Sequence, residues 1–258
     1  MIQLIIVIVG FLVLGSIFLR RYMMAERGIS SFSLFSRKKG VMDLLSIHKG
    51  KDSFEVTVQE MIPERSTVEP KKVAKADTLV KKAEMVLSKG DLKHGEQFLI
   101  QALALDPSNI EIYHKLGLLY LKNGQFGKAE NMYQKLISSA HLDPVFFSNL
   151  GVALYQQKKL EEAKVNYKKA IELDATRPGR FFSLAQVMKE LGEVQEALEH
   201  FKKAVEMDKG NLDYLLTLAQ AYLEADLRAE ARLLLDDIVA AFPENQDAKD
   251  MMKRAGEV

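Results

Sequence analysis

One pattern of apolar and polar positions recurs every 34 residues along this 258-residue chain, five times and without insertion or deletion. In every unit, positions 8 and 20 are Gly or Ala, whereas positions 4 and 24 carry large apolar side chains. A period of this length is typical of two-helix units that stack, because one unit cannot bury its apolar face alone. The pattern predicts an all-α solenoid of five helix-turn-helix repeats over residues 70–245. The units span residues 76–109, 110–143, 144–177, 178–211 and 212–245.

The small residues mark the places where the two helices of a unit approach closely. They are Ala83, Gly117, Gly151, Ala185 and Ala219 at position 8, and Gly95, Ala129, Ala163, Ala197 and Ala231 at position 20. Turn residues at Lys89-Gly90, Asn123-Gly124 and Leu191-Gly192 stand where each first helix must end. We therefore expect a short turn near position 15 of each unit.

The register resembles the tetratricopeptide repeat (TPR) over residues 76–245. Leu116-Gly117 with Tyr120, Leu150-Gly151, and the position-32 prolines Pro107 and Pro243 carry the resemblance. Position 4 holds no Trp, and position 32 is not proline in the three middle units. The resemblance implies a right-handed superhelix whose first helices line a concave, protein-binding face.

The repeats are flanked by a helix start and a helix of different composition. Pro70 is well placed to open the first long helix, because proline is favoured in the first helical turn. Residues 246–258 place Lys249 and Lys253 where the pattern requires core residues. They predict a polar capping helix.

The amino-terminal segment is apolar enough to cross a membrane. Residues 2–19 contain no charge and fourteen Ile, Leu, Val or Phe, and a helix of this length spans about 27 Å. A cleavable signal peptide would need a basic region before the apolar run and a small-x-small site after it, and neither is present. Residues 1–19 are therefore predicted to be a transmembrane anchor.

Basic residues follow the predicted anchor. Residues 20–39 hold six Lys or Arg and one acid, Glu26, so the positive-inside rule places the repeats in the cytoplasm of a single-pass protein of the bacterial inner membrane. Residues 20–69 are predicted to be a basic juxtamembrane segment and flexible linker, in which Phe54, Val56 and Val58 alternate like a short strand without a partner. The alternative is that the repeats face the periplasm.

Charge and composition exclude several functional classes. Residues 76–258 hold 24 basic and 28 acidic residues, which gives no footprint for nucleic acid. There is no Cys, and the five His lack ligand spacing. Gly124 to Ala129 lacks the spacing of a phosphate-binding loop. We therefore expect no enzyme activity, no cofactor, no metal and no small-molecule substrate.

The resemblance implies which residues line the groove that binds a protein or peptide partner. Register places apolar and polar side chains of the first helices there: His114, Leu118, Leu121, Lys122, Asn149, Val152, Tyr155, Phe182, Gln186, Lys189, Leu216 and Gln220. These are the predicted groove residues. The sequence favours a membrane-tethered scaffold or adaptor; the alternatives are a periplasmic assembly factor for envelope proteins and a non-catalytic subunit of an enzyme complex.

Overall fold

The computed structural model describes residue 62 and residues 68–256. Within them the regular structure is entirely α-helical, as the sequence predicts. The helices are α3 (Pro70–Ser88), α4 (Leu92–Leu105), α5 (Ile110–Lys122), α6 (Phe126–Ser138), α7 (Pro144–Gln156), α8 (Leu160–Leu173), α9 (Pro178–Glu190), α10 (Val194–Met207), α11 (Leu212–Glu224), α12 (Arg228–Ala241) and α13 (Gln246–Gly256).

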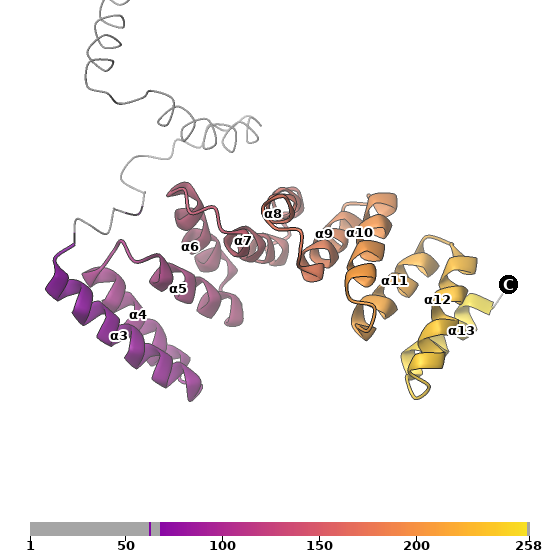
Figure 1. Cartoon of the computed structure of the whole chain (residues 1–258), viewed down its shortest axis with the longest axis horizontal. Helices are drawn as coiled ribbons and strands as arrows, with labels where there is room; N and C mark the ends of the chain where they lie inside the picture. Colours follow the sequence, from indigo (N-terminus) through magenta and orange to yellow (C-terminus); the bar gives the residue numbers. More distant parts are fainter. Residues whose placement is uncertain (1–61, 63–67, 257–258) are drawn as a thin grey trace, which may run out of the picture. The chain divides into compact units, whose positions relative to one another are not determined.

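The helices pack in chain order as a solenoid (Figure 1). The first helix of each unit packs on the second, and the second packs on the first helix of the next unit. The first helices α5 and α7 also contact each other directly. Each repeat thus supplies one wall of the core of its neighbour, which is why the apolar face of a single unit is covered only in the stack.

Local sequence determines where the first helices begin. Asn109, Asp143 and Asn211 each accept a backbone N–H of the following first turn through a side-chain oxygen. These bonds satisfy donors that have no partner inside the helix. Pro144 and Pro178 occupy the first turns of α7 and α9, where the fixed φ of proline suits a helix start. Helices α5, α7, α9 and α11 accordingly begin at position 1 of their units.

The turn between the two helices has the same backbone geometry in all five units. Position 15 has a positive φ at Gly90, Gly124 and Gly192, and also at Lys158 and Asp226. The glycines adopt this conformation without steric cost, whereas Lys158 and Asp226 are held in it by the surrounding repeat. The predicted turn therefore extends to the two units that lack the glycine.

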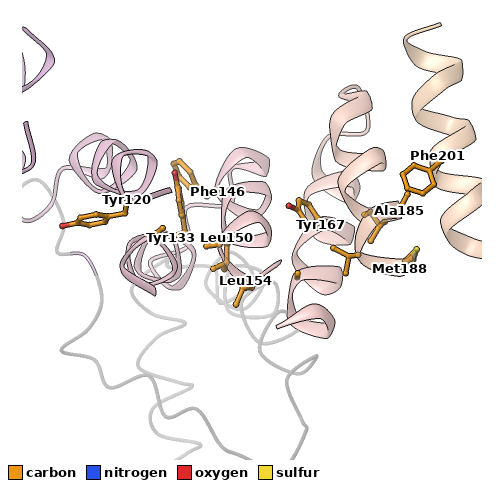
Figure 2. Packing of buried hydrophobic residues seen from close by; sticks show 14 of the residues in the cluster. Tyr120, Tyr133, Phe146, Leu150, Leu154, Tyr167, Ala185, Met188 and Phe201 are labelled. Carbon is orange, nitrogen blue, oxygen red and sulfur yellow. The ribbon is translucent and has the colours of Figure 1, made fainter. Parts of the chain in front are cut away.

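Close helix contact explains the small residue at position 8. A Cβ atom added to Gly117 would lie 2.7 Å from the ring of Tyr133, and one added to Gly151 would lie 2.9 Å from the ring of Tyr167. Figure 2 shows these tyrosines within the row of buried side chains that continues to Phe201. The core is thus a series of large position-24 side chains, each packed against the backbone of a first helix.

Helix α13 covers the end of the stack. It packs on α12 and α11, burying Ala248 and Ala255, and Arg254 donates to the side-chain oxygen of Gln220 at 2.8 Å. Lys249 and Lys253 occupy other positions of the same helix, and Lys253 is exposed. This polar helix closes an apolar surface that a sixth repeat would otherwise cover.

The predicted anchor, residues 1–19, and all but residues 62, 68 and 69 of the predicted 20–69 segment lie outside the described residues. Among the helices that are described, none has the length and apolar character to cross a membrane.

Candidate functional site

The predicted groove residues all lie on the first helices α5, α7, α9 and α11. Leu118 and Lys122 are exposed, and the other ten are partly buried. Side-chain contacts that join neighbouring first helices connect α7 to α9, α9 to α11 and α11 to α13. The structure therefore brings the predicted residues onto consecutive elements, but it also uses many of them to join one repeat to the next.

The apolar members differ in how far they are available to a partner. Leu118 is 44% exposed. Leu121, Val152 and Leu216 are partly buried and packed against the core. Since burying an exposed leucine is favourable by about 1.5–3 kcal/mol, Leu118 has the most to gain from contact with another protein.

Tyr155 and Lys189 form polar links between repeats at position 12. The Tyr155 hydroxyl donates to Glu190 of the next repeat, whose other carboxylate oxygen lies 2.8 Å from Nζ of Lys158. Lys189 donates to Glu224 of the following repeat at 3.2 Å. The bonds from Lys158 and Tyr155 lower the pKa of Glu190. A partner would therefore meet the ring of Tyr155 rather than a free hydroxyl.

The pKa of Tyr155 reflects the same arrangement. Burial, together with the neighbouring Glu190 carboxylate, raises the pKa of the Tyr155 phenol to about 12. The phenol therefore stays protonated and acts as a donor at neutral pH. Its contribution is positional and involves no proton transfer.

His114 and Asn149 lie where repeats two and three meet. The Asn149 amide donates to the Tyr133 hydroxyl at 3.0 Å. The His114 ring lies 5.9 Å from the ring of Tyr133 and 5.2 Å from that of Phe146, between centroids; Figure 2 shows these two aromatic rings side by side. Nδ1 of His114 is buried without a hydrogen-bond partner, and burial lowers the pKa of this ring. Both residues thus support the repeat interface.

Phe182, Gln186 and Gln220 are also partly engaged within the fold. The Phe182 ring stacks on Tyr214 of the next repeat with centroids 4.6 Å apart, and it meets Phe201 edge-on at 5.4 Å. Gln220 donates to Glu224 and accepts from Arg254. Gln186 is partly buried. Phe182 is therefore as much a part of the stack as a candidate contact residue.

Sequence reasoning missed the residues that complete these links. Glu190 and Glu224 both occupy position 13, one repeat beyond the position-12 side chains that they bind. On the second helices, Glu130 is only 8% exposed and accepts from Lys159 at 2.8 and 2.9 Å and from Gln157 at 2.7 Å. Acidic residues recurring at position 13 were a usable signal, whereas the partners of Glu130 depend on how the units stack.

Within residues 68–256 the structure contains no group of three or more His, Cys, Asp or Glu side chains placed to hold a metal ion. The arrangement offers instead a surface of exposed and half-buried apolar side chains bordered by amides and ammonium groups. Such a surface can bind a polypeptide segment.

Comparison with known proteins identifies the repeat type. Four tetratricopeptide-repeat models match the chain, at residues 99–124, 112–144, 144–176 and 189–255. These matches support the tetratricopeptide-repeat family. Among curated proteins, none matches the sequence significantly.

Solved structures share the fold at low sequence identity. YrrB, described as a TPR protein with an unusual peptide-binding site, is 23% identical with a TM-score of 0.59, covering 68% of this chain and 90% of YrrB. PilF of Pseudomonas aeruginosa is 21% identical with a TM-score of 0.57, covering 72% and 90%. MamA of Desulfovibrio magneticus RS-1 is 14% identical with a TM-score of 0.63, covering 67% and 97%. At these identities the likeness shows the solenoid fold alone.

Proposed function

Since the matches support a tetratricopeptide-repeat scaffold, we propose that this chain is a membrane-tethered adaptor that binds a segment of a partner protein along its first helices, with the repeats facing the cytoplasm. The observation that carries the proposal is the exposure of Leu118 on α5. It lies beside other apolar predicted groove residues that are only partly covered. The peptide-binding site named for YrrB supports a polypeptide as the class of ligand.

The chemistry of the surface favours a partner segment with apolar side chains. Leu118, Val152 and the Tyr155 ring supply the apolar contacts. Lys122 supplies charge at the edge and is exposed. Buried aromatic and apolar residues near the centre of an interface usually dominate its energy, while charged edges contribute less. We therefore expect binding to depend weakly on salt.

The test compares two leucines that differ in location. Leu118→Asp places a charge on the first-helix surface, whereas Leu233→Asp places one on α12 at a leucine that is 69% exposed. The full chain and both variants are crosslinked in cells, and the proteins recovered with each are quantified by mass spectrometry. We expect Leu118→Asp to reduce recovery of a specific co-purifying protein by about tenfold or more, and Leu233→Asp to leave it unchanged. Equal recovery with both variants contradicts the proposed surface.

The membrane tether and its orientation have a separate test. The proposal rests on the charge-free residues 2–19 and on the six basic residues that follow them. Alkaline phosphatase fused after Val258 should be inactive, and a fluorescent protein fused there should be bright. A strongly active phosphatase fusion would favour the periplasmic alternative, and recovery of the chain without membranes would rule out the anchor.

A further inference from the structure

A residue that precedes the repeats contacts them far along the chain. The backbone N–H of Ile62 donates to Oγ of Ser139 at 2.8 Å, across 77 positions of sequence. The Ile62 side chain is partly buried and packed against the hydrophobic core. Ser139 is the C-cap of α6, directly before the connection to α7. Ile62 therefore touches the solenoid near the junction of repeats two and three.

Local sequence explains why Ile62 can make this contact. Pro63 follows it, and the residue before a proline is biased towards extended backbone. The Ile62 N–H is thus free of any helical bond and can reach an outside acceptor. The seven residues 63–69 that separate Ile62 from α3 can span up to about 25 Å when extended, so the chain is long enough to reach this position.

Apolar side chains remain exposed beside the contact. Leu142 in the α6–α7 connection is 40% exposed, and Val145 in the first turn of α7 is 41% exposed. They follow Ser139 by three and six positions. This surface, Ser139–Leu142–Val145, offers one polar anchor and two apolar contacts to the chain that carries Ile62.

The sequence before Ile62 has the matching pattern. Phe54, Val56 and Val58 alternate with polar residues, and Ile62 falls in the same phase of that alternation. In an extended segment, residues two apart lie on one face. The face that Ile62 turns towards the repeats is therefore the face that carries Phe54, Val56 and Val58.

We propose that residues 54–62 dock as an extended segment on the Ser139–Leu142–Val145 surface of the same chain. The docked segment gives its apolar alternation the partner that an isolated strand lacks. Because it is tethered to α3 by a short linker, its effective concentration at this surface is high, and a few contacts suffice to hold it. The docking is independent of whether the first helices bind a partner protein.

Hydrogen exchange on the full chain tests the docking through phase. Val56→Asp alters the face that carries Ile62, whereas Thr57→Asp makes the same substitution on the opposite face. We expect Val56→Asp to increase exchange in residues 137–146 several-fold, with the amides of α9–α12 unchanged. Thr57→Asp should match the wild type. Equal exchange in the two variants overturns the proposal.

Disulfide trapping then identifies which chain supplies the segment. The protein has no cysteine, so Ile62→Cys with Ser139→Cys introduces a single pair. Leu173, one repeat beyond Ser139 and 38% exposed, provides the control pair Ile62→Cys with Leu173→Cys. An intramolecular disulfide forming at least about tenfold faster than in the control supports docking. A rate equal to the control, or a disulfide between two chains, overturns it.

Discussion

At the scale of single residues, the size of position 8 is matched to the side chain at position 24 of the same unit. The pairs are Ala83 with Leu99, Gly117 with Tyr133, Gly151 with Tyr167, Ala185 with Phe201, and Ala219 with Leu235. Glycine thus accompanies tyrosine, and alanine accompanies phenylalanine or leucine. The ring of each tyrosine occupies the space that a Cβ would need, which gives this correlation a steric reason.

We expect Gly151→Ala to destabilise the protein although alanine favours helices by about 1 kcal/mol over glycine. The added Cβ would lie 2.9 Å from the buried ring of Tyr167, and overpacking of this kind typically costs about 1–3 kcal/mol. Urea unfolding followed by circular dichroism measures the change in the free energy of unfolding. Adding Tyr167→Phe reproduces the Ala185–Phe201 pair, so the double variant should lose less than the sum of the two single changes. Simple additivity would show that the two side chains do not compete for space.

At the scale of elements, the helix ends show which turns depend on the fold rather than on glycine. Ala140, after α6, has φ +62° and is exposed. Lys158 and Asp226 have similar values at position 15. For a residue with a Cβ this region costs about 1–2 kcal/mol. The stacking of the repeats therefore holds these three turns in a conformation that their own residues disfavour.

Ala140→Gly should stabilise the protein by roughly 0.5–1 kcal/mol, because relief of the left-handed strain exceeds the added freedom of glycine in the unfolded chain. Thermal unfolding would register this as a higher midpoint temperature. Ala225 provides the opposite case, since it caps α11 with φ −85°. Ala225→Gly should lower the midpoint. If both substitutions act in the same direction, backbone strain is not the cause.

At the scale of the whole molecule, two histidines make the stability of the stack depend on pH. Burial lowers the pKa of His114, where Asp143 and Glu111 oppose the effect and Lys115 adds to it. Burial also lowers the pKa of His200, where Lys168 adds to the effect and Glu199 opposes it. A histidine with a depressed folded pKa binds protons more readily when unfolded, so acid favours unfolding.

The midpoint of thermal unfolding should therefore fall as the pH is lowered from about 7 to about 5, the range below the ordinary histidine pKa of about 6.5. Replacing both rings in His114→Phe/His200→Phe should flatten this dependence. The carboxylates with lowered pKa values, such as Glu190 and Asp250, lose their stabilising contribution at lower pH as they are protonated, and the double variant should keep that second decline. An unchanged slope between pH 7 and 5 would assign the pH dependence to other groups.

The sequence by itself determined the all-helical repeat architecture of the described residues. Position 8 and position 20 act within one unit, where helix geometry relates residues three and four apart. The caps at Asn109 and Asp143 involve neighbours two positions away. Such features are local, so the repeating pattern was enough to predict them. Position 15 was recognised only where it is glycine, although the register placed Lys158 and Asp226 at the same position.

Only the tertiary structure decided which predicted groove residues are free to bind a partner. Tyr155 and Lys189 bind acids one repeat away, while Leu118 remains exposed. It also revealed the contact between Ile62 and Ser139, which joins two segments that share no repeat register. These outcomes depend on the angle and distance at which successive units stack. A periodic sequence specifies that the units stack, but which side chains meet across the interface depends on the three-dimensional packing of both units.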